Sequence, residues 1–96
     1  MDLTFIKQQE AGQDPVWVAE FEATSDFNLH IEGVYEGNVK IFQKGVQSGE
    51  YARSHGATPN SPSGRVYDYD LAALVYPKYI KVECATEPSL GVVTFK

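Results

Sequence analysis

The sequence predicts an all-β fold: a single antiparallel β-sandwich of jelly-roll or immunoglobulin-like topology, with about seven or eight short strands. Apolar and polar residues alternate with a period of two over several short runs, which is typical of strands with one buried face. Turns containing Gly or Pro separate these runs. The length of 96 residues fits one domain that spans residues 1–96.

The clearest alternation runs over residues 27–32, where Phe27, Leu29 and Ile31 face one way and the polar residues between them face the other. Gly37 and Asn38 both tolerate positive φ, so they predict a hairpin between this strand and a strand at residues 39–43. Residues 16–23 alternate in their second half. The polar break at 24–26 predicts that this strand pairs with the strand at 27–32.

The same alternation predicts strands at residues 65–70, 78–84 and 92–95. A short strand at 3–6 belongs to residues 1–14, which form an N-terminal arm or an edge strand. Asp70 could cap one or two helical turns ending before Pro77, but such a segment is too short to stand alone and serves better as a turn.

Residues 54–64 lack periodicity and consist of turn formers, so they predict one loop that is long for so small a domain. Loops of this length either serve a function or are mobile, and this one is therefore a candidate functional element.

Thirteen acidic and eight basic residues give a formal net charge of −5, which disfavours binding to nucleic acid or to an anionic membrane. The single Cys84 excludes an intramolecular disulfide. Cys84 lies in an alternating run, so we expect its side chain to be buried as a small apolar residue. A chain without disulfides is typical of synthesis in a reducing compartment. No apolar run approaches the roughly 20 residues of a membrane helix, and no signal peptide is evident. We expect synthesis in the cytoplasm.

Two groups of residues are candidates for metal binding or catalysis. Asp68 and Asp70 project from one face of a strand and could begin a cation site, but the other ligands have no source, so a solvated edge is favoured. A catalytic His needs a nucleophile and an orienting acid in reach, but no Ser or Cys lies in a strained nucleophile turn that could serve His30. His55 has no second His at metal-ligand spacing. We predict that the protein is not an enzyme and holds no metal and no cofactor.

The six tyrosines are better candidates, because rings with a polar tip suit protein interfaces and also stack on sugars. The residues expected to contact a partner come from the N-terminal segment, the long loop and the tyrosines: Leu3, Phe5, Tyr35, Tyr51, His55, Pro59, Asn60, Tyr67, Tyr69 and Tyr76. The segment at 3–6 could add a strand to a partner's sheet edge. Trp17, between two valines, is expected in the core.

Four runs together resemble a known arrangement: Gly-Asn-Val-Lys-Ile-Phe-Gln-Lys at 37–44, Val-Tyr-Asp-Tyr-Asp at 66–70, Tyr-Pro-Lys-Tyr-Ile-Lys-Val at 76–82 and the closing Gly-Val-Val-Thr-Phe at 91–95. It is similar to that of small β-sandwich accessory proteins of tailed-bacteriophage virions, in particular capsid decoration or cement proteins. The resemblance spans residues 37–95. It implies a non-enzymatic protein on the capsid surface, often a homotrimer, that clamps neighbouring major capsid subunits. A location at the tail or neck stays open.

The alternative from a different class is a carbohydrate-binding or adhesin-like module. The long loop and the rings of Tyr51, Tyr67, Tyr69 and Tyr76 motivate it, because sugars stack on such rings.

Overall fold

The computed structural model describes residues 1–34, 39–53, 66–72 and 76–96. These residues form eight strands: β1 (Ile6–Gln8), β2 (Val16–Ala23), β3 (Phe27–Glu32), β4 (Val39–Lys44), β5 (Ala52–Arg53), β6 (Val66–Leu71), β7 (Lys78–Cys84) and β8 (Leu90–Phe95). Within these described ranges there is no helix, and so none that could cross a membrane. The predicted all-β class is confirmed.

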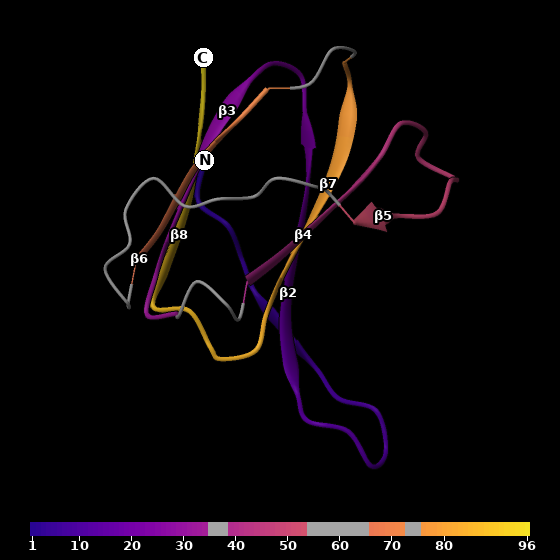
Figure 1. Cartoon of the computed structure of the whole chain (residues 1–96), viewed down its shortest axis with the longest axis vertical. Coiled ribbons are helices and arrows are strands. Elements are labelled where there is room, and N and C mark those ends of the chain that lie inside the picture. Colours follow the sequence, from indigo (N-terminus) through magenta and orange to yellow (C-terminus); the bar gives the residue numbers. More distant parts are fainter. Residues whose placement is uncertain (35–38, 54–65, 73–75) are drawn as a thin grey trace.

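The strands form two antiparallel sheets, with the order β1-β2-β7-β4-β5 in one and β6-β3-β8 in the other (Figure 1). Consecutive strands from β2 to β4, and again from β6 to β8, belong to alternate sheets. The arrangement is compatible with the predicted β-sandwich, and each of these connections carries the chain from one sheet to the other.

This alternation makes two predicted strand pairings wrong. β2 pairs with β1 and β7 rather than with β3, and β3 pairs with β6 and β8 rather than with β4 in a hairpin. The polar break at 24–26 crosses between the sheets: the rings of Phe21 and Phe27, on the two strands that it joins, meet edge to face with centroids 5.2 Å apart. The strands on either side of this break therefore contact each other through the core instead of through backbone hydrogen bonds.

The core consists of apolar side chains from both sheets, packed between them. Its fully buried members include Phe27, Leu29 and Ile31 of β3 and Ile80 and Val82 of β7. These are the residues that the period-two pattern turns toward one face of each strand. Cys84 is also fully buried, as predicted, whereas Trp17 is only partly buried and is absent from this core.

Several boundaries differ from the predictions. The N-terminal strand covers Ile6–Gln8 instead of residues 3–6, and the last strand begins at Leu90 instead of residue 92. Asp70 lies within β6, paired opposite Asn28, and therefore caps no helical turn. The expected hairpin turn at 37–38, residues 73–75 of the expected turn after Asp70 and the long loop at 54–64 lie outside the described residues.

Candidate functional site

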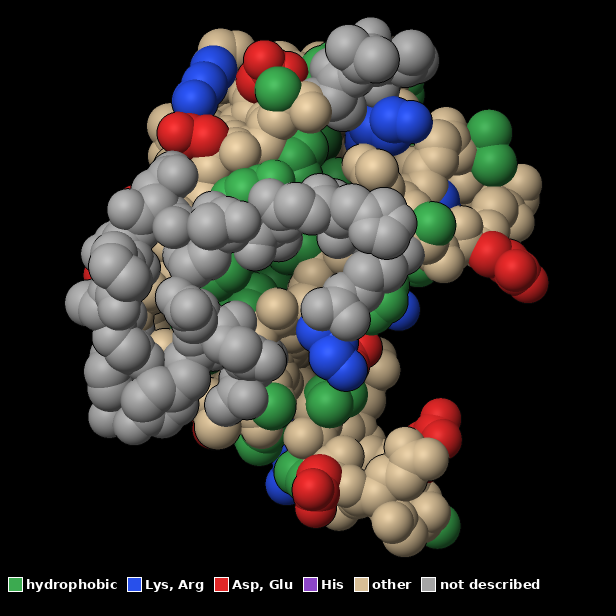
Figure 2. Space-filling model, in the orientation of Figure 1, with side chains coloured by type: hydrophobic (Ala, Val, Ile, Leu, Met, Phe, Trp, Pro, Cys, Tyr) green, Lys and Arg blue, Asp and Glu red, His purple; other side chains and the backbone are tan. Residues whose placement is uncertain are grey.

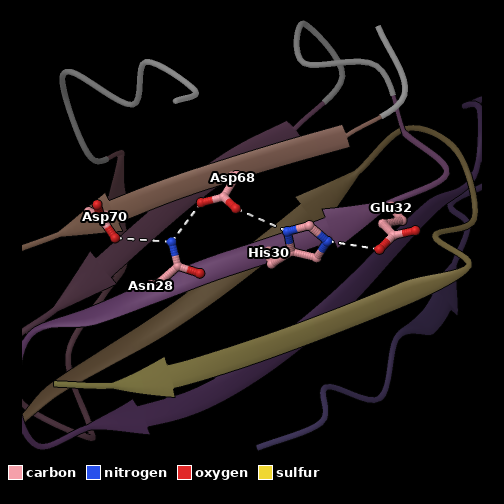
Figure 3. A network of polar contacts seen from close by, with 5 residues as sticks. All are labelled: Asn28, His30, Glu32, Asp68 and Asp70. Atoms are coloured by element: carbon pink, nitrogen blue, oxygen red, sulfur yellow. Dashed lines mark hydrogen bonds and ion pairs between the residues drawn. The ribbon is translucent and has the colours of Figure 1, made fainter. Parts of the chain in front are cut away.

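A row of polar side chains crosses the outer face of the three-stranded sheet (Figure 3). Asn28, His30 and Glu32 alternate along β3, and Asp68 and Asp70 lie opposite them on β6. The Asn28 amide donates to Asp68 Oδ1 at 2.6 Å and to Asp70 Oδ1 at 3.0 Å. His30 Nδ1 lies 3.1 Å from Asp68 Oδ2, and its Nε2 lies 2.8 Å from Glu32 Oε2. We call these five residues the polar network.

The carboxylates on both sides of His30 stabilise its protonated form. The hydrogen bond to Glu32, followed by that to Asp68, raises the pKa of His30 above its ordinary value, and partial burial opposes this rise. The Asn28 amide, followed by His30, lowers the pKa of Asp68. A protonated His30 donates from both ring nitrogens, so its charge ties β3 to β6.

The polar network joins β3 to β6 through the ring of His30. Both nitrogens of His30 already face carboxylates, so neither is directed at a Ser or Cys nucleophile. Among the described residues, no three or more His, Cys, Asp or Glu side chains are arranged to hold a metal ion. Lys96 closes the row through an ion pair with Asp70 at 3.1 Å.

A hollow of about 300 Å³ opens on the five-stranded sheet. The side chains that line it come from β2, β4 and β7 and from the connection between β4 and β5: Glu20, Phe21, Glu22, Lys44, Gln47, Tyr51 and Tyr79. In the register of the sheet, Tyr79 lies between Glu22 on one side and Lys44 on the other. The hollow therefore combines aromatic rings, carboxylates, an amide and an ammonium group, and its volume is at the lower end for a small-molecule site.

Tyr51 is held from several sides at the edge of this hollow. The ammonium groups of Lys44 and Lys81 lie 4.3 Å and 4.9 Å from the centroid of its ring. Burial, followed by the negative charge of Glu20 and a hydrogen bond to it, raises the pKa of Tyr51. Lys81 also lies 4.5 Å from the ring centroid of Phe42. The Tyr51 ring is thus already engaged by cations, which leaves Tyr79 as the better stacking surface in the hollow.

The structure disperses the residues that the sequence nominated for partner contact. Tyr67 is 1% exposed and belongs to the core, so its ring is not accessible for stacking on a sugar. Leu3, Phe5, Tyr69 and Tyr76 are partly buried and pack against that core. Of the nominated residues that the structure describes, only Tyr51 lines the hollow. Tyr35, His55, Pro59 and Asn60 lie outside the described residues.

Sequence reasoning missed the remaining lining residues of the hollow, including Tyr79, Glu22 and Lys44. Each was visible as the outward position of an alternating strand. Their proximity depends on the pairing of β7 with both β2 and β4, strands far apart in the chain, which alternation does not encode.

Comparison of this chain with protein-family models, with curated proteins and with solved structures finds no match.

Proposed function

We propose that this protein is a non-enzymatic accessory protein of a tailed-phage virion, most specifically a capsid decoration or cement protein. It would bind neighbouring major capsid subunits and stabilise their contacts on the capsid surface. The resemblance over residues 37–95 carries the proposal. The described part of this range forms β4, β5 and β7 of one sheet and β6 and β8 of the other, so it contributes strands to both sheets.

Size supports a function that depends on a partner. A domain of 96 residues buries only about two-thirds of the surface of its unfolded chain, so its own core supplies a modest free energy of unfolding. Binding to the folded state alone adds to that stability by mass action. Each copy of a decoration protein would be stabilised in this way when it binds to its site on the capsid.

Sedimentation with capsids tests the proposal. The labelled protein is mixed at micromolar concentration with purified shells of the phage whose genome encodes it, and the shells are pelleted. We expect saturable recovery in the pellet and displacement by excess unlabelled protein. A protein that stays in the supernatant at all shell concentrations contradicts the proposal. Native mass adds a second readout, for which the resemblance implies a trimer.

The hollow on the five-stranded sheet favours a second candidate function, the binding of a carbohydrate. Tyr79 offers a ring to the apolar face of a sugar, and Glu22, Lys44 and Gln47 offer polar atoms to its hydroxyl groups. This assignment differs from the one made from sequence, because Tyr67 is buried and Tyr79 takes the stacking role.

A glycan array separates the two candidates. The carbohydrate function predicts a signal that Tyr79→Ala abolishes and that Tyr79→Phe retains, because phenylalanine keeps the ring. An array without signal, or binding that survives Tyr79→Ala, counts against it.

A further inference from the structure

The segment Met1–Gln8 connects the two sheets along one side of the sandwich. Its first residues pair with the outer edge of β8: Leu3 N donates to Gly91 O at 2.9 Å, and Val93 N donates to Met1 O at 2.8 Å. A few residues later the segment joins the other sheet, where β1 pairs with β2. Met1–Gln8 therefore supplies an edge strand to both layers.

This segment is held mainly by backbone hydrogen bonds. All three residues of β1 are exposed, Ile6 to 62%, so no side chain of this strand enters the core. Only Leu3 and Phe5 pack against the core, and both are partly buried. Segments with so little buried apolar area open at low free-energy cost relative to the rest of a domain.

The connection between β1 and β2 can act as a hinge. Residues 9–14 are exposed, and the hairpin tip that they form projects beyond the body of the sandwich (Figures 1 and 2). Gly12 has φ of 80°, a conformation that turns the chain back on itself and that glycine adopts without strain. Asp14 precedes Pro15, and a residue before proline prefers an extended backbone. The hinge thus contains the residues needed both for the closed turn and for an open, extended form.

We infer that Met1–Gln8 exchanges between copies of the protein, so that the segment of one chain occupies the β8 and β2 edges of a second chain. The exchanged form makes the same hydrogen bonds and the same Leu3 and Phe5 contacts in trans, and differs at the opened hinge, which is why such exchange is a low-cost route to oligomers. The occupant of this edge is a second copy, since its segment is identical to the one already seated there. The inference goes beyond the proposed function and needs no capsid.

The pairing of Asp2 with Val92 provides a direct test. The flanking bonds, from Leu3 N to Gly91 O and from Val93 N to Met1 O, make these residues a non-hydrogen-bonded antiparallel pair, in which the side chains are closest. A cysteine at each position is therefore well placed to form a disulfide. The tagged Asp2→Cys chain and the untagged Val92→Cys chain are unfolded in urea, mixed and refolded together. They are then oxidised and separated without reductant.

Exchange predicts a covalent heterodimer, whose yield rises as the total protein concentration approaches about 1 mM, where trans pairing competes with a tethered segment. The matched control replaces the second chain with Glu87→Cys, at an exposed position after β7 that pairs with no residue of the segment. A heterodimer yield at or below that of the control at every concentration overturns the inference. So does a double variant Asp2→Cys, Val92→Cys that closes only its internal disulfide at 1 mM.

A hinge variant keeps the test independent of the engineered cysteines. Gly12→Ala strains the closed turn, because φ of 80° is costly for alanine, and the strain disappears in the extended hinge. We expect about a fivefold or larger increase in the dimer-to-monomer ratio by size-exclusion chromatography after co-refolding. A ratio unchanged by Gly12→Ala contradicts the inference.

Discussion

His30 Nδ1 of β3 lies 3.1 Å from Asp68 Oδ2 of the neighbouring strand β6, although the two residues are 38 positions apart in the chain. The side chains of both residues are about one-third exposed, 31% for His30 and 33% for Asp68, so solvent screens the interaction. On the other side of the ring, Glu32 accepts from Nε2 at 2.8 Å. The protonation of the His30 imidazole therefore strengthens its contact with Asp68, which joins β3 to β6.

The first prediction concerns the titration of His30. We expect an NMR titration to give His30 a pKa above its ordinary value of 6.5, because both carboxylates stabilise the imidazolium. Glu32→Gln should lower this pKa more than Asp68→Asn does, since the hydrogen bond to Glu32 is the larger cause. The chain has two histidines, so a His55→Gln variant assigns the signals. Equal pKa values in the parent and Glu32→Gln proteins would contradict the network geometry.

The second prediction follows by linkage. The raised pKa of His30 contributes stability that is complete below pH 6.5 and lost as the pH rises through the folded value. The lowered pKa of Asp68 contributes stability that is present above pH 3.8 and lost as the pH falls through its folded value. The pair therefore stabilises the fold most between pH 3.8 and 6.5.

Urea unfolding of the parent and of His30→Gln over this range measures that contribution. We expect the difference in free energy of unfolding to peak between the two values, at no more than about 1 kcal/mol given the exposure of the pair. It should shrink on both sides of the window. A difference that is constant with pH would assign the effect of the substitution to packing alone.

The alternation of residue types predicted which residues form strands and which side of each strand is buried. Phe27–Glu32 and Lys78–Cys84 are strands with the predicted bounds, because a period of two over six or seven residues leaves little freedom in placing them. The partner of each strand was not predictable in the same way. Both β2 and β3 turn one face to a shared core, and that pattern is identical whether they pair within one sheet or face each other from two.

The sequence predicted part of the polar network. The prediction that Asp68 and Asp70 share a face is confirmed, since both carboxylates contact the Asn28 amide. His30 was correctly expected on the outward face of its strand, and Glu32, its partner at 2.8 Å, lies two residues further along the same strand. Its second carboxylate partner, Asp68, lies on β6 and could be placed only through the register that sets His30 opposite Asp68. A register between distant strands depends on the whole core, and no local pattern reports it.

The third prediction compares two leucines on neighbouring strands. Leu29 is fully buried in β3, whereas Leu90 at the start of β8 is 42% exposed. Leu29→Ala should lower the free energy of unfolding by about 2–5 kcal/mol, because it removes buried methyl groups and leaves a cavity. Leu90→Ala removes the same atoms from a solvent-exposed position and should lower the free energy of unfolding by less than about 0.5 kcal/mol. Denaturant unfolding measures both, and equal costs would be incompatible with the observed packing.

The fourth prediction concerns the thiol of Cys84. Burial, followed by the charge of Glu83, raises the pKa of Cys84 to about 12, so at pH 8 only about one molecule in ten thousand carries a thiolate. We expect native protein to react with an aromatic disulfide reagent at a rate set by opening of the fold, whereas protein in urea reacts at the rate of an ordinary thiol. Rapid, complete labelling of the native protein at pH 8 would show that β7 is not buried as described.

The last prediction concerns the close approach of Phe5 to the backbone of β8. A Cβ on Gly91 would lie 2.6 Å from Phe5 Cε2 and 3.3 Å from Leu3 Cβ, so Gly91→Ala must displace the ring. We expect a loss of about 1–3 kcal/mol in the free energy of unfolding, as for other overpacked sites. Gly45→Ala is the matched control, because among the described residues its Cβ would meet only Lys78 Nζ, at an ordinary 3.5 Å.

A double-mutant cycle identifies the cause of that loss. Once Phe5→Ala has removed the ring, the contact at 2.6 Å no longer exists, and Gly91→Ala should cost clearly less than it does in the parent protein. The coupling free energy of the cycle measures how strongly the segment Met1–Gln8 is held against β8. Additive costs for Phe5→Ala and Gly91→Ala would show instead that the segment spends little time on that edge, because a ring that is absent from Gly91 cannot clash with a new methyl group there.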